Sequence, residues 1–198
     1  MKEKTIALLG QPNAGKSTLF NALTGSKQHV GNWPGKTVER KEGFFSHKGT
    51  SYCIVDLPGT YSLSANSEEE IVTRNYIASG EADLICILAD SSQLERSLFM
   101  LADYVGIRVP VILLLNMMDV AASQGKSIDA AGIGKALGIP VVPMVAADKK
   151  QYDTFFKVLE NVDRSNAILQ ESGLHSLYGE KINMPYNTVL NLLPDNGI

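Results

Sequence analysis

Residues 10–17 read GQPNAGKS, which fits the pattern G-x-x-x-x-G-K-[S/T]. The run TIALLG (5–10) before it is typical of a strand, and STLFNALTG (17–25) after it is typical of a helix. In this strand–loop–helix setting, the backbone N–H groups of the loop can hold phosphate groups at the start of the helix. The stretch therefore predicts a phosphate loop; the alternative is a glycine-rich turn without a ligand.

The residues of this loop have different expected roles. Lys16 would contact the β- and γ-phosphates of a nucleotide, and Ser17 would hold Mg²⁺. The whole cradle is expected to comprise Gly10, Asn13, Ala14, Gly15, Lys16, Ser17 and Thr18.

Apolar runs of strand length recur at 50–57, 83–90, 109–116 and 139–145. Most are hydrophobic without a break, as expected for parallel strands covered by helices on both faces. Helices are expected between and after them at 67–80, 97–106, 133–138 and 151–162, the first with Ser67 and Glu70 as a capping box. This alternation predicts an α/β fold with a doubly wound, mostly parallel sheet.

One hairpin interrupts the alternation. VERKEGFFS (38–46) and TSYCIVDL (50–57) flank the short turn HKG (47–49), so they should pair antiparallel. We expect 38–46 to be the edge strand, because its charges would discourage pairing with another sheet edge.

The composition is that of an ordinary globular protein. The 198 residues are 44% hydrophobic and 20% charged, with a net charge of −3 that argues against a nucleic-acid partner. Cys53 and Cys86 lie in strand-like runs and are expected to be buried free thiols in a reducing cytoplasm. The longest apolar run, VPVILLLNMM, falls well short of the ~20 residues of a membrane-spanning helix, so the chain itself is expected to be soluble.

Two segments are expected to complete the phosphate site. DLPG (56–59) ends a strand, where Asp56 could reach Mg²⁺ through water and the Gly59 N–H could bond the γ-phosphate. The alternative for DLPG is a plain Pro-Gly turn. VGNWPGKTVER (30–40) places Thr37 where a switch loop presents its hydroxyl and carbonyl to Mg²⁺ and the γ-phosphate.

The same switch segment contributes further candidates. Gly35 and Lys36 precede Thr37 and are expected to touch the nucleotide. Trp33 is the only tryptophan, and the sequence leaves open whether it is a partly buried anchor or a reporter of the nucleotide state.

LLLNMMD (113–119) predicts a guanine-reading loop at a strand end. The Asp119 carboxylate can accept from both the N1–H and the 2-amino group of guanine, and adenine has neither donor there. Asn116 can bond N7 and a neighbouring loop. Met117 stands where a Lys is common, and it can supply apolar contact to the base but no ammonium. The alternative is an Asn/Asp turn that ends a strand.

A later loop, MVAAD (144–148), is the candidate for contact with the guanine O6 atom. Ala146 can offer its backbone N–H. Val145 stands where a serine is common, so the hydroxyl that would brace this loop is missing.

Taken together, GQPNAGKSTLFNALTG, VGNWPGKTVE, DLPGTYSL and LNMMD resemble the G domain of the bacterial ferrous iron transporter B (FeoB) family, over about residues 3–160. The resemblance implies a Ras-like G domain of the P-loop NTPase fold at 1–162, followed at 163–198 by the start of a helical domain in which YNTVLNLL (186–193) could form a helix. It also implies GTP hydrolysis on the cytoplasmic side of the bacterial inner membrane. The expected partners are the rest of a transporter polypeptide and, through the full-length protein, other copies in an oligomer. The alternatives are a cytosolic ribosome- or tRNA-associated GTPase and a nucleotide-dependent interaction module that hardly hydrolyses GTP.

The expected chemistry is slow. Thr60 follows DLPG where many GTPases carry a water-orienting glutamine, and no arginine finger is identifiable. A K⁺ ion held by the side-chain oxygen of Asn13 could partly replace that missing charge, since such charge is worth roughly 10³–10⁵ in rate. The resemblance implies that carbonyls of Gly31 and Trp33 complete the K⁺ shell. The expected catalytic residues are Asn13, Lys16, Thr37 and Gly59.

Overall fold

The computed structural model describes residues 3–63, 66–163, 165 and 167–178. Within these residues the chain forms a seven-stranded sheet with the order β2-β3-β4-β1-β5-β6-β7. The strands are β1 (Glu3–Gly10), β2 (Gln28–Asn32), β3 (Glu39–His47), β4 (Thr50–Asp56), β5 (Leu84–Asp90), β6 (Val111–Asn116) and β7 (Val141–Pro143). Strand β3 is antiparallel to both of its neighbours and the other pairs are parallel, so the predicted mostly parallel α/β sheet is confirmed.

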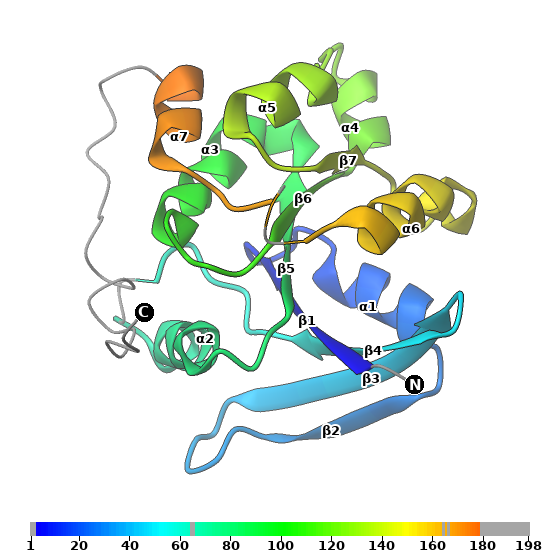
Figure 1. Cartoon of the computed structure of the whole chain (residues 1–198), viewed down its shortest axis with the longest axis vertical. Coiled ribbons are helices and arrows are strands. Elements are labelled where there is room, and N and C mark those ends of the chain that lie inside the picture. The colour runs from blue at the N-terminus through cyan, green and yellow to red at the C-terminus, as the bar shows by residue number, and fades with distance from the viewer. Residues whose placement is uncertain (1–2, 64–65, 164, 166, 179–198) are drawn as a thin grey trace.

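Helices cover both faces of the sheet (Figure 1). They are α1 (Lys16–Thr24), α2 (Glu68–Ser79), α3 (Leu94–Phe99), α4 (Met118–Ser123), α5 (Ala130–Leu137), α6 (Tyr152–Asn161) and α7 (Glu171–Tyr178), with short 3₁₀ helices η1 (Ser91–Gln93), η2 (Met100–Tyr104) and η3 (Lys149–Gln151). The buried side chains of α1 and α6 belong to one core, and those of α2, α3, α5 and α7 belong to the core on the other face.

Strand β1 divides its side chains between the two cores. Ile6 and Leu8 lie in the core under α1 and α6, Ala7 and Leu9 lie in the other, and all four are fully buried. Full burial of a Leu or Ile side chain stabilises by about 1.5–3 kcal/mol relative to exposure. This two-sided burial fixes β1 in the middle of the sheet, so its carboxyl end at Gly10 meets the ends of β5 and β6.

The prediction of which strand lies at the edge of the sheet was wrong. The segment 38–46 is not at the edge, because β3 lies between β4 and the outermost strand β2. The sequence predicts a loop over 30–40, but Val30–Asn32 belong to β2 and pair with β3. All five residues of β2 are exposed, so no apolar pattern marks the strand in the sequence. Backbone pairing with β3 and the Gln28 side-chain amide, which donates to the end of α1, hold it in place.

Element lengths also differ from the expectations. The helix expected at 97–106 is the short α3 continued by the 3₁₀ helix η2, and the strand expected at 139–145 is only Val141–Pro143. The serine half of the expected capping box of α2 is confirmed, since the Ser67 hydroxyl accepts from the Glu70 N–H at 3.2 Å. The Glu70 carboxylate accepts from the Asn66 N–H at 2.9 Å, one residue before the position that a capping box uses.

The described residues after α6 pack back onto the same two cores. The N–H of Val111 donates to the carbonyl of Ala167 at 2.7 Å. Leu169 and Leu174 are buried in the core that also contains α2 and α5. The domain boundary at residue 162 therefore stays a prediction.

Two further points concern the ends of the chain. The expected helix at 186–193 lies outside the described residues. None of the helices that the structure describes is both long and apolar enough to span a membrane.

Candidate nucleotide-binding site

The loop between β1 and α1 takes a tight path that its glycines allow. Gly15 has φ 96° at the start of α1, and a side chain there would collide with the amide of Asn116. A Cβ atom on Gly10 would lie 2.7 Å from the carbonyl oxygen of Leu88. Asn13 has φ 65°, in the left-handed region that Asn tolerates better than most residues. The loop backbone is thus drawn close against β5 and β6.

Lys16 and Asp56 face each other at the edge of a pocket of about 190 Å³. Their side chains are only 11% and 10% exposed, and Lys16 Nζ lies 4.0 Å from Asp56 Oδ1. Burial lowers the pKa of Lys16, although Asp56 opposes the shift. Burial raises the pKa of Asp56, although Lys16 and then Lys41 oppose it. Both charged groups have lost water, so an incoming phosphate would suit Lys16 and an incoming cation would suit Asp56.

Gly59 lies directly against the phosphate loop. A Cβ atom at Gly59 would be 3.1 Å from the Pro12 nitrogen and 3.3 Å from Lys16 Nζ. Because no side chain separates them, the backbone of Gly59 stays beside the loop, as its expected contact with the γ-phosphate requires.

The residues at this edge fit a magnesium ion. Oδ1 of Asp56 is buried and has no hydrogen-bond partner, so a cation bound next to this oxygen would be favourable. Ser17 lies in the first turn of α1 and can add a hydroxyl oxygen. Mg²⁺ binds through one or two protein oxygens together with phosphate oxygens and water, so Asp56 and Ser17 could hold it beside a bound nucleotide.

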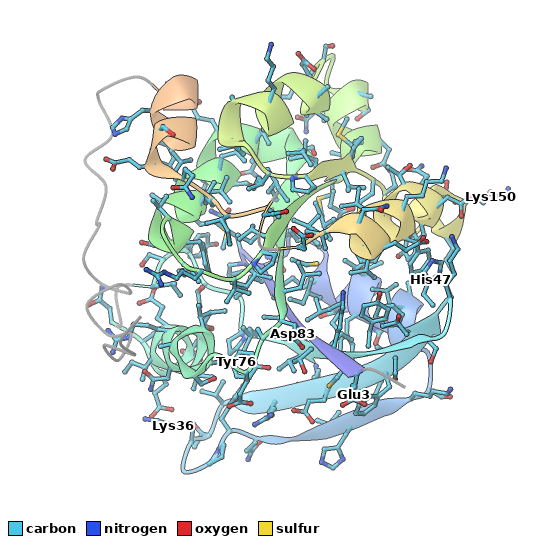
Figure 2. The ribbon with its side chains drawn as sticks, in the orientation of Figure 1. Glu3, Lys36, His47, Tyr76, Asp83 and Lys150 are labelled. Carbon is cyan, nitrogen blue, oxygen red and sulfur yellow. The ribbon has the colours of Figure 1, made fainter. Side chains whose placement is uncertain are left out.

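The switch segment does not bring Thr37 into this pocket. The Thr37 hydroxyl donates to Glu68 Oε2 at 3.1 Å, and Lys36 Nζ lies 3.9 Å from Oε1 of the same carboxylate. Gly35 forms the turn with φ 68°. The tip of the β2–β3 hairpin therefore lies beside α2, well away from the β1–α1 loop (Figure 1), and Lys36 marks this tip in Figure 2. Contact of Thr37 with Mg²⁺ stays a prediction, and it requires the tip to move.

Trp33 anchors the hairpin tip to α2. Its side chain is 8% exposed, its ring meets Tyr76 edge-on at 5.4 Å, and the Arg40 guanidinium lies 4.5 Å from its ring centre. Aromatic pairs and cation–π contacts each contribute about 0.5–1 kcal/mol. The anchoring role is thus present, and the reporter role stays a prediction. Gly31 pairs with Arg40 across the hairpin, so both expected carbonyl ligands of K⁺ lie in this docked segment.

Asn116 ties two loops together at the end of β6. Its amide nitrogen donates to the Ala14 carbonyl at 2.8 Å, and its oxygen accepts from the Ala146 N–H at 2.8 Å. It is 3% exposed. Met117, which follows, has φ 61° and turns the chain so that Asp119 stands exposed in the first turn of α4. This arrangement puts Asn116 next to the phosphate loop, with Asp119 three residues further on at the start of α4.

The backbone N–H groups expected to contact the guanine O6 atom already have other hydrogen-bond partners. The Ala146 N–H points to Asn116, and the Val145 N–H donates to Gln151 Oε1 at 3.1 Å. Either N–H would have to exchange its present partner for the base, so this contact also stays a prediction.

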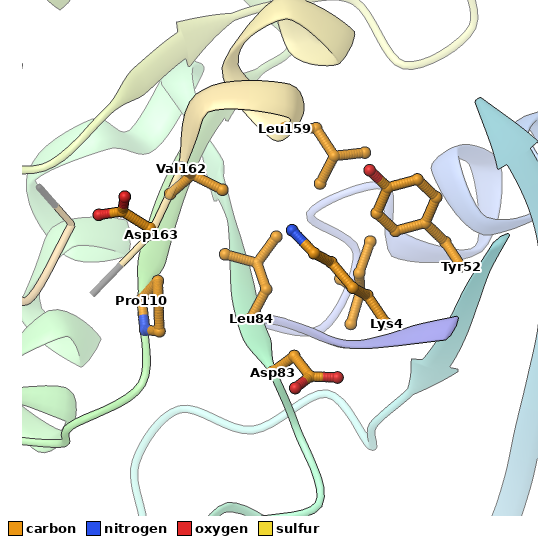
Figure 3. Close-up of a pocket in the computed structure, with 9 residues that line it drawn as sticks. Lys4, Tyr52, Asp83, Leu84, Pro110, Leu159, Val162 and Asp163 are labelled. Carbon is orange, nitrogen blue, oxygen red and sulfur yellow. The ribbon is translucent and has the colours of Figure 1, made fainter. Parts of the chain in front are cut away.

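A different cavity opens at the opposite edge of the sheet (Figure 3). It measures about 250 Å³, and the Lys4 ammonium extends into it between Leu84 and Leu159. It lies at the amino ends of the parallel strands, whereas ligands of open α/β sheets bind at the carboxyl ends. The nucleotide site is therefore the edge that carries the phosphate loop.

The sequence analysis missed Glu39 and Lys41, which line the pocket, and Glu68, which holds the hairpin tip. Lys41 could have been found, because the predicted hairpin places it on β3 opposite the end of β4. Glu68 left no such signal, since its bond to Thr37 joins segments that are 31 residues apart.

A phosphate loop after β1, a carboxylate at the end of β4 and an Asn/Asp loop after β6 define a P-loop NTPase of the Ras-like G-domain class. Within that class the sequence model described as "Ferrous iron transport protein B" matches residues 4–159. The chain belongs to this family, FeoB, and its similarity to the family's N-terminal G domain is confirmed.

Similar proteins agree with this assignment. The Fe(2+) transporter FeoB of Escherichia coli K12 is 44% identical over 173 residues, which are 82% of this chain and 22% of that protein. The crystal structure of the G domain of the T. maritima FeoB iron transporter is 43% identical with a TM-score of 0.75, over 80% of this chain and 98% of that one. The cytosolic domain of L. pneumophila FeoB has a TM-score of 0.79 at 37% identity, over 84% and 73%. The chain thus spans about a fifth of the curated relatives it matches.

Proposed function

We propose that this chain binds GTP and GDP, hydrolyses GTP slowly, and thereby regulates or drives Fe²⁺ movement through the rest of a transporter polypeptide at the cytoplasmic face of the membrane. The observation that carries the proposal is the meeting of three loops at one sheet edge. Asn116 bonds both the phosphate loop and the 144–148 loop, while Lys16 and Asp56 face each other beside them. A cytosolic ribosome- or tRNA-associated GTPase finds no specific support.

The residues at this edge supply most of a nucleotide site. Lys16 and the N–H groups of the phosphate loop bind the phosphates, and Asp119 with Asn116 selects guanine. Ser17 and Asp56 would hold Mg²⁺, which supplies charge stabilisation to the transferring phosphoryl group. Solved structures of T. maritima FeoB are named as GDP and GMPPNP forms, which supports guanine nucleotides as the ligands here.

Potassium activation is the finer part of the proposal. Asn13 is exposed on the phosphate loop and its side-chain oxygen is available to a cation next to the phosphates. Gly31 and Trp33 would add carbonyl oxygens once the hairpin tip leaves α2, and Thr37 would reach Mg²⁺ in the same movement. The K⁺ charge would take the place of an arginine finger.

In this proposal Fe²⁺ is the cargo of the transporter and not a resident ion of this domain. Among the described residues no group of three or more His, Cys, Asp or Glu side chains could hold a metal ion. The proposal places the Fe²⁺ path in the part of the transporter that this chain does not span.

Steady-state phosphate release by the purified chain tests the proposal. With Mg²⁺, K⁺ and GTP we expect slow turnover that ATP does not support. Lys16→Ala should abolish it, while Lys27→Ala, on an exposed turn, should leave it unchanged. Nucleotide binding without turnover would instead support the interaction-module alternative.

A further inference from the structure

The phosphate pocket contains a second ammonium group that no expected role uses. The pocket is lined by Lys16, Val38, Glu39, Lys41, Asp56, Leu57, Pro58 and Gly59. Lys16 lines it from α1 and Lys41 lines it from β3. Lys16 is the expected ligand of the phosphates, whereas Lys41 has no assigned role.

The strand register places Lys41 beside Asp56. Lys41 of β3 is paired directly with Asp56 of β4, and directly opposed residues of antiparallel strands project on the same face about 4.5–5.5 Å apart at Cβ. Lys41 opposes the burial-driven rise in the pKa of Asp56, so its charge reaches that carboxylate. Because Asp56 Oδ1 has no hydrogen-bond partner, Lys16 and Lys41 are the cations that compensate it.

Glu39 offers Lys41 a different partner. It lies two positions earlier on the same strand and therefore on the same face. Lys41 Nζ is 2.6 Å from Glu39 Oε1, and the two side chains are 36% and 55% exposed. The ammonium can thus be held at the mouth of the pocket, away from the buried carboxylate.

We propose that Lys41 competes with Mg²⁺ for Asp56, and that Glu39 relieves this competition by holding the Lys41 ammonium at the pocket mouth. The Glu39–Lys41 pair then sets how readily the nucleotide-loaded protein takes up Mg²⁺. A divalent ion beside Asp56 repels Lys41, and the repulsion is smaller when Glu39 neutralises that ammonium. The inference rests on the proposed nucleotide binding and adds a regulator of metal affinity to it.

The test is a Mg²⁺ titration of the protein loaded with the fluorescent nucleotide mant-GDP, read as the nucleotide dissociation rate at constant ionic strength. Lys41→Met should lower the half-saturating Mg²⁺ concentration by about fivefold, equivalent to about 1 kcal/mol. Glu39→Gln should raise it by about threefold. Lys41→Arg should stay close to the native value, and Lys27→Met, which removes the same charge outside the pocket, should have no effect.

The double variant Lys41→Met/Glu39→Gln separates the mechanism from a simple field effect. If Glu39 acts through Lys41, the double variant matches Lys41→Met. An undiminished Glu39→Gln effect in that background would show that Glu39 acts on the metal directly and overturn the proposal. Weaker mant-GDP binding by Lys41→Met in EDTA would also overturn it, because Lys41 would then be a phosphate ligand. If the native chain does not bind mant-GDP, the proposed function itself is contradicted.

Discussion

Asp119 carries the expected base selectivity, and the left-handed turn at Met117 leaves it exposed in the first turn of α4. We predict that Asp119→Asn weakens GDP binding by about 100-fold, because two hydrogen bonds to a charged acceptor are lost. Xanthine nucleotides should gain affinity, since their 2-oxo group accepts from an amide but repels a carboxylate. Titrations with GDP and with xanthosine diphosphate measure the two affinities. Asp153→Asn on α6 is the matched charge control. Unchanged GDP affinity would remove Asp119 from the site.

Asn13 is the expected K⁺ ligand, and its φ of 65° matters for the choice of variant. Alanine would add strain in the left-handed region, so Asn13→Gly is the cleaner removal of the side-chain oxygen. We predict that K⁺ accelerates GTP hydrolysis by the native chain by roughly tenfold over Na⁺, about 1.4 kcal/mol of barrier. Asn13→Gly should remove the acceleration and keep GDP binding nearly intact. Equal native rates in KCl and NaCl would contradict the K⁺ role.

The residues of the phosphate and guanine loops could be located from sequence because each follows a strand in a short, ordered pattern. The sequence could not show that hydrogen-bond donors expected to contact the nucleotide or its metal ion already bond to other protein groups. The Ala146 N–H is bonded to Asn116, and Thr37 is bonded to Glu68. Such contacts join distant segments, so no local pattern records them.

At the scale of elements, the β2–β3 hairpin is the part that must change if the K⁺ and Mg²⁺ roles hold. The docked tip buries Trp33 against Tyr76 and Arg40. We predict that GMPPNP with Mg²⁺ and K⁺ shifts the Trp33 emission to longer wavelength than GDP does, because the ring leaves this environment. It is the only tryptophan, so the signal has one source. Trp33→Phe supplies the blank. Identical spectra in both states would mean that the tip stays on α2.

The hairpin also shows where prediction of elements fails. β1, β5 and β6 were found because continuous apolar runs leave few alternatives to buried parallel strands. β2 was missed because its residues QHVGN are all exposed, and its place depends on backbone bonds to β3 and on the Gln28 amide, which bonds the end of α1.

For the whole molecule, the two cores explain how the nucleotide edge is held. One core joins α1 and α6 to the sheet, and the other joins α2, α5 and α7. The phosphate loop leads into α1, and the Glu68 contact lies at the start of α2, so movement of the hairpin tip loosens a contact with one core only. The end of β3 is tied separately to α6, because Nε2 of His47 lies 2.7 Å from Oε1 of Glu160.

The packing of helix α7 bears on whether the domain ends at residue 162 or includes the residues that follow. A Cβ atom on Gly173 would lie 2.8 Å from the Leu137 oxygen and 2.9 Å from its Cα, so α7 packs directly on the backbone of α5. We predict that Gly173→Ala lowers the free energy of unfolding by about 1–3 kcal/mol, because the added methyl must push the helices apart. Ser172→Ala, on the exposed side of the same turn, should change it by less than about 0.5 kcal/mol. Urea unfolding of both variants makes the comparison. If both are as stable as the native chain, α7 is not part of the cooperative fold, and the boundary belongs before it.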